Sequence, residues 1–375
     1  MTTPDDRDYE ARVAALLSTA KPGINLLDGA RNAKGMFPAE LQRRFRERGV
    51  ALSQSTRRIN YKPPTYSPEL HALDGEWYFT ESTRADLVRL IGTGRVCLLG
   101  TPTVAARLDM SSFILIDRNP FIRDRFNFFE EEANIVISNV EDTDIGSRFD
   151  VVLFDPPWYV PQLLEWFALA ARAVSPQGKI MFPLLGELTR PTAQQERETL
   201  LTLAAAVGEV EIFPSAIKYD TPLFEQRALA ASGIQLDGPW RRADLVSVRV
   251  RSLIAAPVAT LSSQEDTDQW STFVLGSQVV KLRANCALNY NEKMIHHIEG
   301  VSDCLYDSVS RRNPHWNAID FWTSRNRVAQ VGDRAAVEKV LSMLQGDSYG
   351  LHERVKALRA AQGAIADELL RILEV

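Results

Sequence analysis

Seven short runs rich in β-branched and other apolar residues recur between residues 96 and 250, and several are apolar throughout. Continuous apolar runs are typical of parallel strands that are covered on both faces. Segments with helical periodicity, such as residues 161–174, lie between them. This alternation predicts an α/β fold built around a seven-stranded sheet. The expected strands are residues 96–100, 113–117, 134–138, 150–155, 179–184, 209–213 and 245–250.

The chain of 375 residues, 45% of them hydrophobic, is long enough for two or three domains. We expect three parts. Residues 1–75 form a helical, partly basic region with 12 basic and 9 acidic side chains, or +3, within a chain of net charge -5. Residues 76–255 form the sheet domain. Residues 256–375 form a mixed, mainly helical region with one hairpin, and its role is left open.

Bulk properties exclude several classes of protein. A net charge of -5 argues against a generic nucleic-acid binder. Cys97, Cys286 and Cys304 are far apart and lack the spacing of metal ligands, so we expect reduced thiols and no metal. The polar N-terminus is unlike a signal peptide, and no apolar run has the length of a membrane span. We therefore expect a cytoplasmic protein without membrane contact, in an unknown oligomeric state.

Small or polar residues follow the expected strands, at the edge of a parallel sheet where ligands bind. Gly100-Thr101-Pro102 follows the first strand, and its backbone could approach a ligand or form an ordinary turn. Asp117 ends the second strand and could accept ribose hydroxyls or cap a helix. Asn139 and Val140 follow the third strand and could flank an adenine ring or form a plain polar turn.

The fourth strand ends in Asp155-Pro156-Pro157-Trp158, which resembles the (D/N)PP(Y/F/W) signature of amino-methyltransferases. The lone pair of an exocyclic adenine amine is conjugated into the ring, so the amine is a poor nucleophile. A carboxylate and a backbone carbonyl that accept its two N–H bonds would favour a nucleophilic geometry. The prolines fix the backbone that carries these acceptors. Trp158 offers a flat face on which an extruded base could stack.

Together with residues 76–91, 96–108, 113–120 and 149–154, this motif resembles a branch of the class I S-adenosylmethionine (SAM) methyltransferases, the N6-adenine methyltransferase-like family. The branch includes elongation factor 1A lysine methyltransferases and a large-subunit rRNA adenine methyltransferase. The resemblance implies a Rossmann-like fold, SAM as cofactor, and catalytic roles for residues 155–158. It also implies SAM contacts from the set Gly100, Thr101, Pro102, Asp117, Asn139, Val140 and Asp155. The zinc-binding cysteines of the rRNA enzyme are missing, and Asn139 replaces the usual acid.

Three hypotheses about function remain. The first, N6-adenine in RNA or DNA, is favoured by the basic stretch 43–62. The second is a protein lysine, whose methylated product suits aromatic walls. The third is a non-catalytic binding module with this fold. For the first hypothesis, the expected substrate-binding residues are Trp158, Tyr159, Arg43, Arg44, Arg57 and Arg58.

Overall fold

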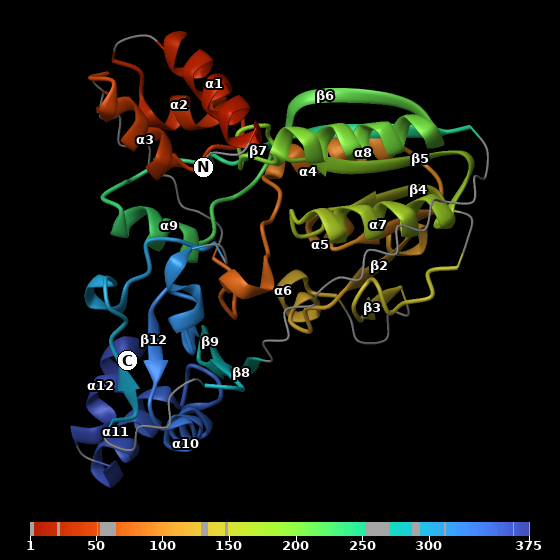
Figure 1. The fold of residues 1–375 in the computed structure, drawn as a ribbon. Coiled ribbons are helices and arrows are strands. Elements are labelled where there is room, and N and C mark those ends of the chain that lie inside the picture. Colours follow the sequence, from red (N-terminus) through yellow and green to blue (C-terminus); the bar gives the residue numbers. More distant parts are fainter. Residues whose placement is uncertain are drawn as a thin grey trace. The chain divides into compact units, whose positions relative to one another are not determined.

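The computed structural model divides the chain into two compact units (Figure 1). It describes residues 4–20, 23–50, 52, 65–128, 134–146, 149–251, 270–286, 293–310, 313–362 and 364–374. Unit 1 comprises Met1–Tyr61, Trp77–Asp220 and Leu236–Ser263, and unit 2 comprises Lys62–Glu76, Thr221–Gln235 and Gln264–Val375. This division differs from the expected three parts. The N-terminal helices belong to the sheet unit, and a segment from within the expected sheet domain belongs to unit 2.

Unit 1 is built on a seven-stranded sheet with the order β3-β2-β1-β4-β5-β7-β6. Its strands are β1 (Val96–Leu99), β2 (Phe113–Asp117), β3 (Ile135–Ile137), β4 (Phe149–Phe154), β5 (Val174–Leu184), β6 (Gly208–Lys218) and β7 (Arg242–Val250). β1 to β5 pair in parallel, whereas β7 runs antiparallel to both β5 and β6. This is the strand order of the class I methyltransferase fold. It confirms the predicted fold class.

Helices cover both faces of the sheet, which explains the continuous apolar strands. The helices are α4 (Glu81–Ile91), α5 (Pro102–Ala105), α6 (Ile122–Phe126), α7 (Val160–Ala173) and α8 (Ala193–Val207), with the short η2 (Met110–Ser112). Leu99 and Phe154 pack on the side of α7 and α8, and Leu98 and Leu153 pack on the side of α4, α5 and α6. These four side chains are fully buried.

The N-terminal helices α1 (Pro4–Ser18), α2 (Leu26–Asn32) and α3 (Pro38–Glu47) dock on the same unit. The N–H of Leu188 donates to the carbonyl of Lys34 over 2.9 Å. Nε of Arg31 donates to the carbonyl of Pro239 over 3.1 Å. A Cβ on Gly186 would lie 2.1 Å from the carbonyl oxygen of Lys34, so only glycine permits this approach. These contacts hold the helices against the loop after β5 and the chain before β7.

Unit 2 contains a five-stranded antiparallel sheet with the order β10-β12-β11-β9-β8. Its strands are β8 (Trp270–Leu275), β9 (Gln278–Arg283), β10 (Ile295–His296), β11 (Phe321–Thr323) and β12 (Val328–Val331). Its helices are α9 (Leu223–Ala231), α10 (Arg334–Leu344), α11 (Leu351–Gln362) and α12 (Ala364–Leu373), with η1 (Ala72–Asp74), η3 (Ser302–Cys304) and η4 (Pro314–Ala318). Side chains of α10, α11 and α12 share one core with β8, β9, β11 and β12.

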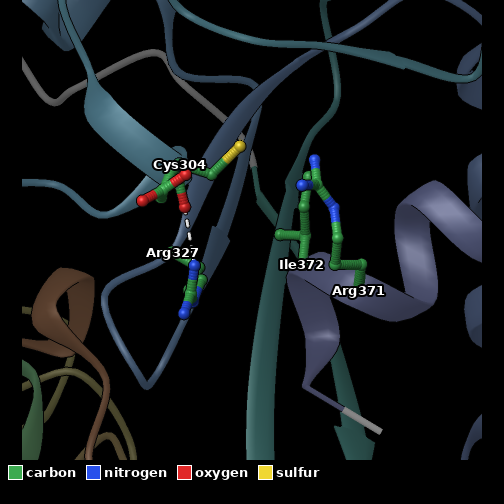
Figure 2. Close-up of a pocket in the computed structure, with 5 residues that line it drawn as sticks. Cys304, Arg327, Arg371 and Ile372 are labelled. Carbon is green, nitrogen blue, oxygen red and sulfur yellow. Dashed lines mark hydrogen bonds between the residues drawn. The ribbon is translucent and has the colours of Figure 1, made fainter.

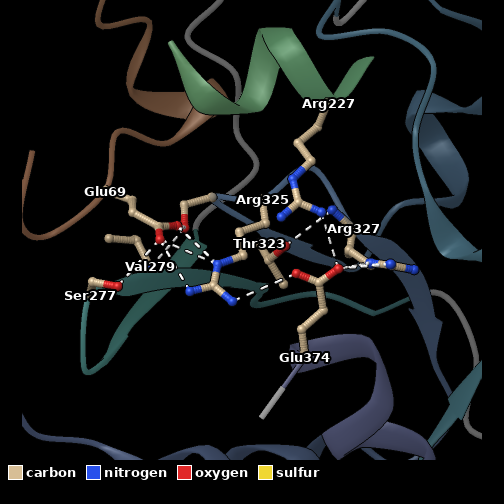
Figure 3. Close-up of polar contacts among 9 residues, drawn as sticks. Glu69, Arg227, Ser277, Val279, Thr323, Arg325, Arg327 and Glu374 are labelled. Carbon is tan, nitrogen blue, oxygen red and sulfur yellow. Dashed lines mark hydrogen bonds and ion pairs between the residues drawn. The ribbon is translucent and has the colours of Figure 1, made fainter. Parts of the chain in front are cut away.

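A cluster of ion pairs joins distant segments within unit 2 (Figure 3). Glu374, after the last helix, accepts from Arg327 over 2.8 Å and from Arg227 of α9 over 3.1 Å. Arg325 lies 3.6 Å from Glu374 and 3.2 Å from Glu69. Two carboxylates therefore hold three arginines, and this network fixes the C-terminal end of the chain to α9 and to the turn between β11 and β12.

Candidate functional site

The carboxyl ends of the first four strands are hydrogen-bonded to one another. The N–H of Asp155 donates to the carbonyl of Leu99 over 3.1 Å, and the N–H of Gly100 donates to the carbonyl of Ile116 over 2.9 Å. The N–H of Ser138 donates to the carbonyl of Asp117 over 3.0 Å. The structure thus places Gly100, Asp117 and Asp155 along one edge of the sheet. This is the edge where open α/β sheets bind ligands.

The turn after β1 needs glycine and contains a buried hydroxyl. Gly100 has φ 63°, and a Cβ there would lie 3.1 Å from the ring of Trp166 and 3.3 Å from the carbonyl oxygen of Asp155. Thr101 is 1% exposed, and its Oγ1 has no hydrogen-bond partner within the described part of the chain. Pro102 begins α5. A buried hydroxyl of this kind is ready to bond a ligand.

The residues after β2 and β3 make local contacts. Oδ1 of Asp117 accepts the N–H of Asn119 over 2.8 Å, so this carboxylate shapes its own loop and does not cap α6. Nδ2 of Asn139 donates to Asp142 over 2.8 Å. Val140 is 2% exposed and belongs to the core. Asp117 ends β2 and the other two residues follow β3, but the amide of Asn139 is engaged within its loop and Val140 packs in the core.

Another side-chain contact crosses this edge. Nε1 of Trp166, on α7, donates to Oε1 of Glu141 over 2.5 Å. Trp166 also contacts the position of Gly100. α7 therefore bonds to the loop after β3 directly over the turn after β1. Sequence reasoning missed this pair because its partners are 25 residues apart.

Asp155 is a half-buried carboxylate with two side-chain donors. Burial raises its pKa to about 7, and hydrogen bonds from Tyr219 and Trp158, with the positive charge of Arg241, oppose the rise. The hydroxyl of Tyr219 donates to Oδ1 of Asp155 over 3.1 Å. Asp155 therefore changes charge near neutral pH, as is common for groups at functional sites.

Aromatic rings surround a guanidinium beside this carboxylate. The Cζ of Arg241 lies 3.7 Å from the ring centre of Trp77, 5.1 Å from that of Trp158 and 5.6 Å from that of Trp240. Trp158 and Tyr219 meet edge to face at 5.7 Å. These distances are within the range of cation–π attraction. We call Trp77, Trp158, Tyr219 and Trp240 the aromatic box.

Tyr219 and Arg241 reach the site because of the direction of β7. Tyr219 directly follows β6 and Arg241 directly precedes β7, and the N–H of Tyr219 donates to the carbonyl of Arg241 over 3.1 Å. Since β7 is antiparallel to β5, its beginning lies at the carboxyl end of the parallel strands. Neither residue was predicted as a site residue. Their position at the ends of two expected strands was the available signal.

The N-terminal helices border the aromatic box. The rings of Phe37 and Trp240 meet edge to face at 5.9 Å. Two arginines expected to contact substrate are paired with carboxylates, Arg43 with Glu40 and Glu47, and Arg44 with Glu40 and Glu10. Their charges are therefore largely offset. The hydrogen bond to Glu10 raises the pKa of Arg44, and burial opposes this rise.

The other expected substrate-binding residues have different positions. Arg57 and Arg58 lie outside the described residues. Tyr159 is half-buried, and its backbone precedes α7 and donates to the carbonyl of Pro157 over 2.7 Å. Pro156 is buried beneath this turn and Pro157 is half-buried. The two prolines and Tyr159 therefore shape the backbone between Asp155 and α7.

Among the described residues, no helix is long and apolar enough to cross a membrane. The His, Cys, Asp and Glu side chains of these residues form no group of three with the geometry to hold a metal ion.

No protein-family model and no curated protein sequence matches this chain. Solved structures with a similar fold include a branched-chain polyamine synthase mutein from Thermus thermophilus, in complex with N4-aminopropylspermidine and 5′-methylthioadenosine. Its identity is 15%, its TM-score is 0.48, and the match covers 67% of this chain and 89% of that one. The N-methyltransferase NodS from Bradyrhizobium japonicum is 17% identical with a TM-score of 0.31, and the match covers 45% of this chain and 94% of NodS. Similarity at this level concerns fold alone.

Changing Gly100 to alanine should destabilise the protein and weaken ligand binding at the strand edge. The left-handed backbone alone costs about 1 kcal/mol with a side chain, and the new methyl group would also press on Trp166. The control is Gly146→Ala, where φ is 66° and nothing lies within 4 Å. Urea denaturation should show a larger loss for Gly100→Ala, and equal losses would contradict a crowded turn.

Proposed function

We propose that unit 1 is a SAM-dependent methyltransferase that methylates an amine nitrogen, with adenine N6 in RNA or DNA as the target. The observation that carries the proposal is the carboxylate of Asp155 at the end of β4, within an Asp-Pro-Pro-Trp sequence. The hydroxyl of Tyr219 donates a hydrogen bond of 3.1 Å to this carboxylate. The turn at Gly100 lies beside it, because a Cβ built on Gly100 would be 3.3 Å from the carbonyl oxygen of Asp155.

The residues at the strand edge fit SAM. Gly100 lets the backbone approach a ligand closely, and the buried hydroxyl of Thr101 has no protein partner in the described ranges. Asp117, only 8% exposed, places a carboxylate where a ribose would be bound. SAM would supply an electrophilic methyl group at this edge. Gly100, Thr101 and Asp117 are the residues that we propose hold it.

Asp155 would orient the amine. An ionised carboxylate accepts an N–H bond, and the rigid prolines keep this acceptor and the adjacent backbone carbonyl in place. Tyr219 donates to Oδ1, so it fixes the rotamer of the carboxylate. Because burial raises the pKa of Asp155 to about 7, the ionised form, which is the stronger acceptor, predominates only above neutral pH.

Arg241 favours adenine over lysine as the substrate. Its guanidinium lies within the aromatic box, and its charge acts on the Asp155 carboxylate. A cationic lysine would meet this positive charge, whereas a neutral base would stack beside it without repulsion. Arginine also stacks on bases and pairs with phosphate. A nucleotide therefore suits the charge of this site better than an ammonium group.

Changing Arg241 to glutamine should reverse that preference. Methylation of a nucleic-acid substrate should fall about tenfold, on the scale of one lost desolvated cation–π contact, and methylation of lysine peptides should not fall. The control is the neighbouring Arg242→Gln, which removes the same charge from the first residue of β7. Rates measured on an RNA or DNA fragment and on a lysine peptide would decide. A loss confined to the peptide would favour lysine.

The proposal is tested with the full chain. SAM binding is first measured by calorimetry. Unmethylated RNA transcripts and amplified DNA are then incubated with the protein and SAM, digested to nucleosides and analysed by mass spectrometry for N6-methyladenosine or its deoxy form. We expect both binding and product. Absence of SAM binding would instead favour a non-catalytic binding module, and SAM binding with protein methylation alone would favour a lysine methyltransferase.

A further inference from the structure

Unit 2 contains a thiol beside a basic cavity that the proposed methyl transfer does not use. The cavity has a volume of about 190 Å³ and is lined by Asp303, Cys304, Arg327, Arg371 and Ile372 (Figure 2). All five residues belong to unit 2. An engineered protein cavity of about 150 Å³ accepts benzene. The volume is therefore sufficient for a molecule of a few heavy atoms.

Cys304 has the surroundings of a nucleophile. Its Sγ lies 2.9 Å from Nδ1 of His297, at hydrogen-bond distance for sulfur. Nε2 of His297 lies 3.4 Å from Oε1 of Glu368 on α12. Catalytic thiols are activated by a neighbouring imidazole that is itself oriented by a third group, such as a carboxylate. In the tautomer with its proton on Nε2, the imidazole faces Glu368 with this N–H and can accept the thiol proton at Nδ1. Arg371 then lies beside Nε2 without a hydrogen bond to it.

Arg371 gives the cavity its preference for anions, because the second arginine of the lining, Arg327, is already paired with Glu374. Arg371 is exposed, and its Nη2 lies 3.2 Å from Nε2 of His297. Arg327 donates through Nη1 to the carbonyl of Asp303 over 2.6 Å. Figure 2 shows the Cys304 sulfur directed toward the side of the cavity where Arg371 lies. Burial raises the pKa of Cys304, the charges of Arg371 and Arg327 oppose the rise, and those of Glu368 and Asp303 add to it.

The backbone supports this presentation of the thiol. Asp303 and Cys304 have φ 49° and 57°, so two successive residues other than glycine are left-handed. Such strain costs about 1–3 kcal/mol per residue and is concentrated at functional sites. Cys304 carries this strain although it is only 1% exposed, and it lines the cavity.

We propose that Cys304 is a nucleophilic thiol that is modified by small anionic electrophiles bound in this cavity. In the reaction, the thiol proton moves to Nδ1 of His297 and the sulfur forms a bond to the electrophilic carbon. The bond from that carbon to the leaving group breaks, and the leaving group departs with the electron pair. Arg371 attracts the negative charge of the electrophile.

The other two cysteines serve as internal controls. Cys97 is fully buried in β1, and burial raises its pKa to about 12. Cys286 donates to the carbonyl of Arg283 over 3.3 Å, and burial raises its pKa to about 11. Neither has a histidine contact among the bonds described for it. Cys304 should therefore react first in the folded chain.

The test is alkylation of the folded full chain with iodoacetate or iodoacetamide, followed by peptide mass spectrometry. We expect the iodoacetate-to-iodoacetamide rate ratio at Cys304 to exceed that of the denatured chain about tenfold, the lower end of electrostatic enhancement. Arg371→Gln should abolish this preference. The control Arg359→Gln removes an exposed charge from α11, outside the cavity lining, and should keep it. His297→Asn should slow both reagents about tenfold or more.

Two results would overturn the proposal. One is labelling of Cys304 no faster than labelling of Cys97 and Cys286 in the folded chain. The other is an unchanged rate ratio in Arg371→Gln. Arg371 is exposed, so this variant should fold, and its thermal unfolding is compared with that of the wild type.

Discussion

Changing Asp155 to alanine is expected to lower methyl-transfer turnover by about a hundredfold or more, the effect of losing one preorganised polar group. SAM affinity should change little, because the carboxylate orients the amine and not the cofactor. The measurement pairs a methyl-transfer assay with SAM calorimetry. Full activity in Asp155→Ala would remove the catalytic assignment.

Asp155→Asn is the matched control, because an amide oxygen still accepts an N–H bond but has no charge to titrate. This variant should retain more activity than Asp155→Ala. Wild-type turnover should rise with pH through about 7, where Asp155 ionises. The same rise in Asp155→Asn would assign it to another group.

The raised pKa also predicts how stability depends on pH. Between the ordinary value of 3.8 and about 7, the folded protein binds the Asp155 proton more tightly than the unfolded chain does. Stability from this group is therefore lost as pH rises through that window. Asp155→Asn should remove this loss. The unfolding temperature of this variant, relative to that of the wild type, should therefore be higher at pH 8 than at pH 5.

The second large effect is expected at Glu374, where three arginines of unit 2 converge (Figure 3). Removing one partner of a fully buried ion pair costs about 3–5 kcal/mol. The side chain of Glu374 is 23% exposed, so solvent screens part of this effect. We expect Glu374→Gln to lower the free energy of unfolding of the folded chain by about 2–3 kcal/mol.

Urea denaturation of the full chain measures that loss. The control is Glu338→Gln, which breaks an exposed pair with Arg334 on α10 and should cost no more than about 0.5 kcal/mol. Burial would raise the pKa of Glu374, but the hydrogen bond from Arg327 and the nearby charges lower it overall. Its contribution should therefore be present above the ordinary value of 4.5 and lost as pH falls below it. Equal losses in the two variants would contradict the network.

The sheet was predictable because its signal is local. β1 and β4 are buried on both faces, so their sequences are apolar almost throughout, and the polar residues that follow mark the edge of the sheet. β6 was predicted as residues 209–213 but extends over Gly208–Lys218. Many of its side chains are exposed, and its pairing shifts register between Phe213 and Ile217. An irregular, partly exposed strand gives a weak apolar pattern.

The missing site residues depend on tertiary structure. Tyr219 contacts Asp155 across 64 residues, and Arg241 enters the aromatic box only because β7 is antiparallel. Likewise, the charge of Arg44 is offset by Glu10, 34 residues away, which a count over the basic stretch omits. Sequence patterns identified the Asp155 motif and the turn at Gly100, where each strand ends. They could not identify side chains brought there by the folded chain.

The most direct test of methyl transfer at Asp155 uses SAM carrying a tritiated methyl group. The full chain and its Asp155→Ala variant are incubated separately with total RNA, DNA and protein fractions, and the label in each fraction is counted. We predict that the wild type labels RNA or DNA at adenine and that the variant loses this label while still binding SAM. Label in none of the fractions despite SAM binding, or equal labelling by the two proteins, would contradict a methyl-transfer site built on Asp155.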